Sequence, residues 1–225
     1  MITEQELSLI AEKSKREPEV VDLYRTHDYM TAYALHTDWR VRKDGPRSAI
    51  GDAKDWERHG ELQAEFLKRM ELRPHHSLLE IGCGTGRLAR KMVPYLGAYG
   101  YWGVDISQLA VESAAEMLLA DGFTHFRVGQ SWPIATFDYL WSFSVTIHLP
   151  QDELVTMMAR AAERMNSRSQ FFFSYHPQPS ELRTGLKQFR HTLETYESAA
   201  REAGLSFRKV DEWQGEQSVA LARLL

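Results

Sequence analysis

The stretch Leu78-Leu79-Glu80-Ile81-Gly82-Cys83-Gly84-Thr85-Gly86 decides the fold of this chain. In it, an apolar run that contains one carboxylate leads into three glycines at alternate positions. Glycine adopts backbone angles closed to other residues and leaves no Cβ between the chain and a bound molecule. A strand that enters such a turn and leaves it as a helix forms a site for a ligand that lies against bare backbone.

The composition around this stretch indicates one large globular domain. The chain has 225 residues, 43% of them hydrophobic, and a formal net charge of −4, so no basic field favours nucleic acid. Its single cysteine excludes a disulfide within the chain and favours a reducing compartment. No apolar run reaches the ~18 residues of a membrane span, and the first residues lack the apolar core of a signal peptide. We therefore expect a cytoplasmic protein without a membrane span, as a monomer or a homodimer.

Hydrophobic periodicity divides the chain into two regions. Residues 1–58 show helical patterns at 4–16 and 20–35 and then an irregular stretch, which predicts a helical cap or lid. In residues 59–225, strands alternate with helices, which are expected at 61–72, 87–96, 152–165 and 192–203 and between Ser107 and Gly122. Strands are expected at 77–81, 101–105, 124–128, 137–143, 170–175, 206–213 and 217–224. This alternation predicts an α/β fold, a doubly wound, mostly parallel sheet of seven strands with a C-terminal antiparallel hairpin strand.

The residues after the glycines narrow the class of ligand. A nicotinamide or flavin site needs Gly-x-Gly-x-x-Gly, but Arg87 stands where the last glycine belongs, and the Gly-Lys-Ser/Thr of a P-loop is absent. Asp105 follows Gly86 by 19 residues, at the end of the second predicted strand. A carboxylate there accepts hydrogen bonds from two ribose hydroxyls and disfavours a 2′-phosphate.

Four segments in order resemble the class I S-adenosylmethionine-dependent methyltransferases, and the resemblance covers roughly residues 56–225. They are the glycine turn, Tyr101-Trp102-Gly103-Val104-Asp105-Ile106-Ser107, Val128-Gly129-Gln130-Ser131, and the run from Phe137 to Val145 that leads to His148-Leu149-Pro150. The resemblance implies S-adenosylmethionine as the cofactor and methyl transfer as the activity.

The resemblance also implies which residues bind the cofactor. Glu80, Gly82, Cys83, Gly84 and Gly86 would border its methionine and ribose parts, Asp105 would bind the ribose hydroxyls and Ile106 would pack on the adenine. Gln130 and Ser131 stand where the family usually has an acid near the adenine amino group, and the amide oxygen of Gln130 can accept the same bond. Phe143 completes the predicted cofactor site. We expect Cys83 to be a packed residue rather than a nucleophile, since no His or acid stands beside it in sequence.

Two histidines are candidates for the general base that a hydroxyl or ammonium acceptor requires. His148 follows the fourth predicted strand and His176 the fifth, and ligands of open α/β sheets bind at the carboxyl ends of the strands. Structural alternatives stay open for both: His148 at the start of a helix, His176 in a solvated loop.

The segment after the fourth strand excludes several subclasses. It lacks the Asn/Asp-Pro-Pro-Tyr/Phe motif of nucleic-acid amino-methyltransferases, an acid that could bind a metal, and the paired-glutamate loop of protein-arginine enzymes. A small molecule or sugar remains as the acceptor, and no metal is expected. The segments 49–52 and 56–60 resemble bacterial methyltransferases found with glycan biosynthesis.

The N-terminal region would then supply acceptor specificity through a cluster of polar and aromatic residues. It comprises Tyr24, His27, Asp28, Tyr29, His36, Asp38 and Arg40. An ordinary helical cap with solvated charges is the alternative interpretation of this cluster. For the whole chain, a non-catalytic cofactor-binding subunit and a dinucleotide-dependent oxidoreductase remain competing functions.

Overall fold

The computed structural model describes residues 3, 5, 7, 9, 10, 12, 17–49 and 53–225. Most of the helix predicted at 4–16 lies outside these residues, as do residues 50–52 of the segment that resembles glycan methyltransferases. In the described part of the chain, no helix is long and apolar enough to cross a membrane.

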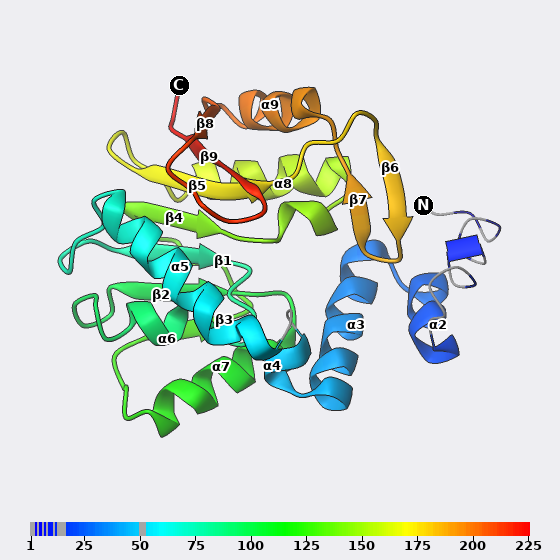
Figure 1. Ribbon diagram of the computed structural model, residues 1–225, viewed down its shortest axis with the longest axis horizontal. Helices are drawn as coiled ribbons and strands as arrows, with labels where there is room; N and C mark the ends of the chain where they lie inside the picture. The colour runs from blue at the N-terminus through cyan, green and yellow to red at the C-terminus, as the bar shows by residue number, and fades with distance from the viewer. Residues whose placement is uncertain are drawn as a thin grey trace.

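A seven-stranded sheet forms the centre of the molecule (Figure 1). Its strands, in the order in which they lie side by side, are β3 (Arg127–Gly129), β2 (Tyr101–Val104), β1 (Leu78–Ile81), β4 (Tyr139–Ser142), β5 (Gln170–Tyr175), β9 (Ser218–Ala222) and β8 (Arg208–Val210). The first five are parallel, whereas β9 is antiparallel to both of its neighbours. The predicted α/β fold, with its mostly parallel sheet and antiparallel C-terminal strand, is confirmed.

Helices cover both faces of the sheet, and an apolar cluster lies under each layer. The helices α5 (Trp56–Arg69), α6 (Ala89–Met92) and α7 (Gln108–Ala120) pack on one face, where Phe66, Trp141 and Phe172 are buried. On the other face, α8 (Gln151–Ala162) and α9 (Leu193–Glu202) pack over Phe171 and Phe173. Strand β1 is buried along its whole length and lies between β2 and β4, so the glycine turn at its carboxyl end lies away from the edges of the sheet.

The N-terminal region forms helices that stand at one end of the sheet (Figure 1). The helix predicted at 20–35 is two helices, α2 (Pro18–Thr26) and α3 (Tyr29–Asp44), because the Asp28 side chain accepts a hydrogen bond from the Thr31 N–H and begins α3. Helix α3 also extends to Asp44, into the stretch 40–55 that was expected to be irregular, and α4 (Pro46–Ala49) and the short 3₁₀ helix η1 (Ala53–Asp55) follow it. The boundary predicted after residue 58 falls inside α5.

A two-stranded hairpin that the sequence analysis did not predict completes this end of the molecule. Strands β6 (Leu182–Gly185) and β7 (Gln188–Arg190) form it between β5 and α9. The Arg183 guanidinium lies over the rings of Tyr24, Tyr29 and Phe189, at 5.9, 5.5 and 5.1 Å, so it joins the hairpin to α2 and α3. Figure 1 shows the hairpin beside α3.

Candidate active site

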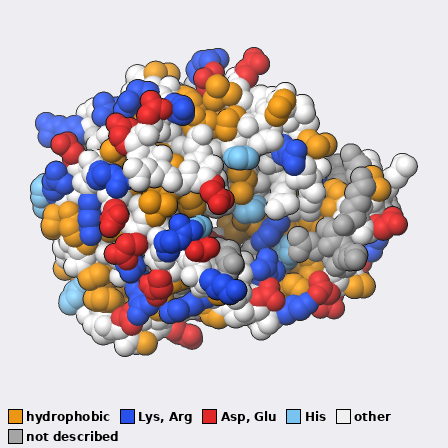
Figure 2. All heavy atoms as spheres, viewed as in Figure 1, with side chains coloured by type: hydrophobic (Ala, Val, Ile, Leu, Met, Phe, Trp, Pro, Cys, Tyr) orange, Lys and Arg blue, Asp and Glu red, His pale blue; other side chains and the backbone are white. Residues whose placement is uncertain are grey.

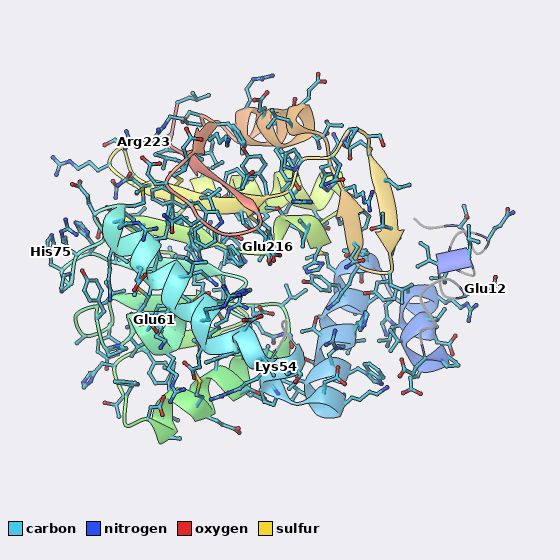
Figure 3. The ribbon with its side chains drawn as sticks, viewed as in Figure 1. Glu12, Lys54, Glu61, His75, Glu216 and Arg223 are labelled. Atoms are coloured by element: carbon cyan, nitrogen blue, oxygen red, sulfur yellow. The ribbon has the colours of Figure 1, made fainter. Side chains whose placement is uncertain are left out.

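A cavity of about 400 Å³ lies at the carboxyl ends of the central strands, where the glycine turn faces α3 and the tip of the hairpin. Figure 2 shows the corresponding hollow, with hydrophobic, histidine and basic side chains around it. Of the residues predicted to bind cofactor or act in catalysis, those that line the cavity are Glu80, Gly82, Cys83, Gly84, Asp105, Ile106, Gln130, Phe143 and His148. Figure 3 shows His75, in the loop before β1, at the opposite end of the sheet from α3.

The three glycines of the turn after β1 have different structural roles. Gly82 has φ 77°, and a Cβ there would overlap the Val145 side chain. Gly84 has φ 53°, and its N–H donates to Asp105 Oδ2 at 2.8 Å. Gly86, with φ 88°, does not line the cavity; a Cβ there would lie 2.8 Å from Met117 Cε of α7. Gly82 and Gly84 line the cavity, the absent Cβ of Gly82 leaves room for Val145, and Gly86 allows α7 to pack against the turn.

Asp105 is fixed at the end of β2 by backbone donors. Its Oδ2 accepts from Gly84 N–H and its Oδ1 accepts from Ser107 N–H at 2.9 Å. Burial raises the pKa of the Asp105 carboxyl above its usual value, although these hydrogen bonds act in the opposite direction. Each oxygen keeps a further lone pair for a ligand hydroxyl.

Gln130 and Ile106 lie next to each other beside Asp105. The Gln130 Nε2 donates to the Ile106 carbonyl at 2.7 Å, which leaves the amide oxygen of Gln130 as an acceptor. Both residues line the cavity, whereas Ser131 is exposed and does not.

Glu80 is a buried acid beneath the glycine turn. One of its oxygens accepts a hydrogen bond from the Tyr101 hydroxyl at 2.5 Å, and 5% of its surface is exposed. Burial raises the pKa of Glu80 to about 8, although Tyr101 and Arg87 act to lower it. Cys83 is buried nearby, and burial raises the pKa of its thiol well above the usual value, so a thiolate nucleophile is disfavoured.

His148 lies in the short 3₁₀ helix η2 (Thr146–His148) that follows β4. Its Nδ1 is 2.6 Å from the Lys187 carbonyl oxygen on the hairpin tip. A carbonyl oxygen only accepts, so Nδ1 carries the proton and Nε2 keeps its lone pair. The Tyr29 hydroxyl donates to the His148 carbonyl at 2.5 Å, so the hairpin and α3 both hold this residue. Burial, reinforced by the Lys187 charge, lowers the pKa of His148 to about 4.

The second predicted base, His176, lies elsewhere. It follows β5, is exposed to solvent and does not line the cavity. The structure therefore places one of the two candidate histidines at the cavity and leaves the other outside it.

The polar cluster predicted in the N-terminal region makes mostly internal contacts. Tyr24 Oη and His36 Nδ1 are hydrogen-bonded at 3.0 Å, Tyr29 reaches His148, and of the seven residues only Arg40 lines the cavity. The other residues of α3 that line it are Met30, Tyr33 and Thr37. Because residues 33, 37 and 40 are spaced by about one helical turn each, one face of α3 covers the cavity.

Asp38 of the same cluster acts on a neighbouring helix. Its Oδ1 accepts from the Ser107 hydroxyl at 2.5 Å and from the Leu109 N–H at 3.1 Å, and its side chain is buried. Ser107 in turn accepts from the Ala110 N–H. Asp38 thus joins α3 to the amino end of α7 and is not a cavity residue. His27 is exposed.

Further cavity residues were not among those predicted from the sequence. The main ones are Gln63, Arg87, Tyr33 and Lys187. Arg87 directly follows the glycine turn, so its place in the sequence already pointed to the cavity, whereas Gln63 and Lys187 carry no local signal. In the described ranges, no group of three or more His, Cys, Asp or Glu side chains could hold a metal ion.

These features fit a nucleoside cofactor with an amino-acid part. Bare backbone at Gly82 and Gly84 admits a ligand, Asp105 presents acceptors for ribose hydroxyls, and Ile106 and Gln130 offer an apolar surface and an amide for a base. The buried Glu80 and the partly buried Arg87 add a carboxyl and a guanidinium group to the lining of the cavity. The fold is Rossmann-like, and the site has the features expected of a methyltransferase with this fold.

Comparison with known proteins matches a segment of the chain to one protein family. Residues 78–167 match the family model described as "Methyltransferase domain". The chain is 29% identical over 110 residues to "Methyltransferase GfsG" of Streptomyces halstedii, an alignment that covers 45% of this chain and 39% of that protein. The chain thus aligns with less than half of the length of this curated relative.

Two solved structures share the fold. Magnesium protoporphyrin IX methyltransferase from Synechocystis, crystallised with S-adenosylmethionine, has a TM-score of 0.66, 17% identity and coverage of 89% of this chain and 99% of that one. The sugar N-methyltransferase KedS8 from Streptoalloteichus has a TM-score of 0.59, 16% identity and coverage of 73% and 87%. By its matched segment and its fold, the chain is similar to S-adenosylmethionine-dependent methyltransferases.

Proposed function

We propose that this chain transfers a methyl group from S-adenosylmethionine to a hydroxyl or amine of a small molecule, with a sugar or glycan precursor as the favoured acceptor. The observation that carries the proposal is His148, whose unprotonated Nε2 belongs to a ring held at the cavity by Lys187 and Tyr29. A fixed base beside the cofactor site is what an acceptor with a proton to lose requires.

The cofactor supplies an activated methyl group, and the residues of this chain orient it and its acceptor. Asp105 would accept hydrogen bonds from the ribose hydroxyls, Ile106 and Gln130 would hold the adenine, and the backbone at Gly82 and Gly84 would lie against the ligand. His148 Nε2 takes the proton of the acceptor group, while its Nδ1–H stays bonded to the Lys187 carbonyl. The low pKa of His148 keeps this base in its neutral form near pH 7.

Support for a sugar or other small acceptor comes from the size of the site and from the neighbours. Helix α3 and the hairpin tip line the cavity, whose volume of about 400 Å³ is in the range of small-molecule sites. One structural neighbour is a sugar N-methyltransferase. The composition and the absence of a flipped-base motif argue against nucleic acid.

Two measurements test this function. Calorimetric titration with S-adenosylhomocysteine and with NAD should show binding of the first alone. A labelled methyl donor offered with a metabolite extract should label a small molecule, and the His148→Asn variant should lose about 10²- to 10⁴-fold in turnover while it binds S-adenosylhomocysteine normally. His176→Asn is the matched control, expected to keep its turnover. Full activity in the His148 variant would show that His148 is not the general base.

A further inference from the structure

His191 connects the base of the hairpin to the segment that carries the candidate base. It directly follows β7, Glu181 directly precedes β6, and His191 is 2% exposed. Its Nδ1 lies 2.7 Å from Glu181 Oε2, and its Nε2 lies 2.8 Å from the Leu149 carbonyl oxygen. Leu149 is the residue after His148 and lines the cavity with it. The ring of His191 therefore joins the hairpin to the end of η2.

These two contacts require a proton on each nitrogen of His191. A carbonyl oxygen and an ionised carboxylate only accept hydrogen bonds. The Oε1 of Glu181 also accepts from the Thr192 N–H and from the Thr195 hydroxyl, each at 2.6 Å. Although burial acts to raise the pKa of Glu181, the hydrogen bonds from Thr195, Thr192 and His191 place it below its usual value. With an ionised Glu181 and a carbonyl as partners, His191 is an imidazolium.

The charged ring lies among aromatic side chains. The Phe189 ring is stacked on it, with 6.3 Å between ring centres, and the Tyr196 ring of α9 meets it edge-on at 5.6 Å. The titratable groups that face His191 are Glu181, Tyr196 and, beyond Leu149, the imidazole of His148. Burial raises the pKa of Tyr196, so its hydroxyl stays neutral. Glu181 thus balances the charge of His191.

The bond to Leu149 adds to two others that hold the same segment. The Tyr29 hydroxyl donates to the His148 carbonyl, and His148 Nδ1–H donates to the Lys187 carbonyl. The hairpin therefore holds η2 twice, with its tip through the His148 ring and with its base through the carbonyl of the next residue. A displacement of about 1 Å in a catalytic group can reduce turnover by about 10²-fold. Loss of the bond from His191 would release the backbone directly beside the candidate base.

We propose that the ion pair of Glu181 and His191 positions His148 for proton transfer. This inference rests on the proposed function, in which His148 takes the proton of the acceptor. His191 is a positioning residue, since it acts through Leu149 and does not line the cavity. The carboxylate holds the Nδ1 proton more strongly than the carbonyl holds the Nε2 proton, so deprotonation of His191 breaks the bond to Leu149. One histidine must stay charged so that the other can act as a neutral base.

NMR of the ligand-free chain tests the ion pair without an acceptor. The nitrogen shifts should show His191 protonated on both nitrogens and His148 on Nδ1 alone. In His191→Leu, the pKa of His148 should rise from about 4 toward its usual value, because a released η2 admits water to the ring. His75→Leu, which replaces the exposed histidine labelled in Figure 3, is the matched control and should leave that pKa unchanged. A neutral His191, or the same His148 pKa in both variants, would overturn the proposal.

Glu181→Gln separates the charge of His191 from its bond to Leu149. The amide oxygen still accepts from Thr192 and Thr195, and the amide N–H₂ donates to the Nδ1 of a neutral ring, which keeps its Nε2 proton for Leu149. Transfer of label from a methyl donor to a metabolite extract should fall in the wild type as the pH rises through the titration of His191 seen by NMR. In Glu181→Gln this fall should be absent.

A matched control accompanies the pH profile. Glu194→Gln replaces an exposed acid in the first turn of α9 and should follow the wild type. The same fall in Glu181→Gln as in the wild type would overturn the role of the ion pair.

Turnover and cofactor binding separate positioning from folding. His191→Leu should lose about 10²-fold in labelled product, whereas its binding of S-adenosylhomocysteine should equal that of the wild type because His191 lies outside the cavity. Equal losses of binding and turnover would assign His191 to the fold alone and overturn the proposal. An extract that takes up no label from the wild type would overturn the proposed function. The His148 pKa in His191→Leu would then still confirm or refute the bond that holds η2.

Discussion

Glu71 ends helix α5 in a conformation that suits glycine better than glutamate. Its φ is 70°, and the Leu72 N–H donates to the Leu67 carbonyl at 3.0 Å while the Glu71 N–H donates to that of Lys68 at 3.2 Å. This is the hydrogen-bond pattern of a Schellman motif, in which the residue after the cap is left-handed. A side chain in that region costs about 1–2 kcal/mol.

We therefore expect Glu71→Gly to stabilise the protein. Glu71 is exposed, so its side chain contributes little packing, and relief of the left-handed strain should raise the free energy of unfolding by about 0.5–1 kcal/mol. Urea denaturation measures the change. Glu65→Gly, at an exposed position inside the same helix, is the matched control and should lower the free energy of unfolding by about 1 kcal/mol. Destabilisation at position 71 would contradict the argument.

At the scale of elements, the strands and helices predicted best are those whose own residues are buried. Strands β1 and β5 are apolar runs that are buried almost throughout, and each was predicted within one residue of its bounds. Helix α9 was predicted equally well because Thr192 caps it. In contrast, the segment 87–96 is mostly turn, with α-helix only at Ala89–Met92. A short amphipathic pattern alone does not establish a helix.

The β6–β7 hairpin could not be predicted because distant residues stabilise it. Its strands are short and mostly exposed, and Arg183 fixes it through rings that stand far away in the sequence, on α2 and α3. For the same reason, two residues of the site could not be predicted from the sequence. Gln63 reads as part of an amphipathic helix and Lys187 as part of a loop, and only the packing of α5 and the hairpin brings both to the cavity.

Asp38 links α3 to α7, so its substitution should weaken the packing between these two helices. Its carboxylate accepts from Ser107 and Leu109 at the amino end of α7. Asp38→Ala leaves these buried donors unpaired, and we expect a loss of about 1–3 kcal/mol in the free energy of unfolding. Asp38→Asn retains an oxygen acceptor and should lose less. Equal stabilities of the Ala variant and the wild type in urea denaturation would show that α3 and α7 are joined by other contacts.

The hairpin also affects the pKa of His148, the candidate base, through the charge of Lys187. The charge of Lys187 disfavours the imidazolium form of His148, in addition to burial. In Lys187→Met we expect the pKa of His148 to rise from about 4 toward its usual value without reaching it, because burial, the larger cause, remains. NMR titration of the imidazole measures this shift. Lys209→Met, which removes an exposed lysine of β8, should leave the pKa unchanged. The same value in both variants would exclude an electrostatic role for Lys187.

At the scale of the whole molecule, two buried groups oppose each other in the pH dependence of stability. Glu80 has a raised pKa, so the stability that it contributes is complete below about pH 4.5 and is lost as the pH rises through about 8. His148 has a lowered pKa, so its contribution is present above about pH 6.5 and is lost as the pH falls toward 4. The ligand-free protein should therefore lose stability as the pH rises through about 8, because the buried carboxyl of Glu80 then ionises.

A ligand that carries an ammonium group should oppose the loss of stability that Glu80 causes as the pH rises. Tyr101 of β2, Arg87, Cys83 and Asp105 are the titratable and charged groups that act on Glu80. A bound ammonium would favour the carboxylate, so below about pH 8 binding must release a proton, and affinity should rise from pH 6 to pH 8.

Thermal unfolding of the whole chain measures this linkage. Excess S-adenosylhomocysteine should raise the melting temperature more at pH 8 than at pH 6, because stabilisation follows affinity. Methylthioadenosine, which has no ammonium group, should stabilise the chain equally at both values. Glu80→Gln cannot release the proton and should abolish the difference for S-adenosylhomocysteine. If the difference between pH 6 and pH 8 persists in this variant, another group releases the proton. If the difference is lost, Glu80 is the group that couples cofactor binding to the pH dependence of stability.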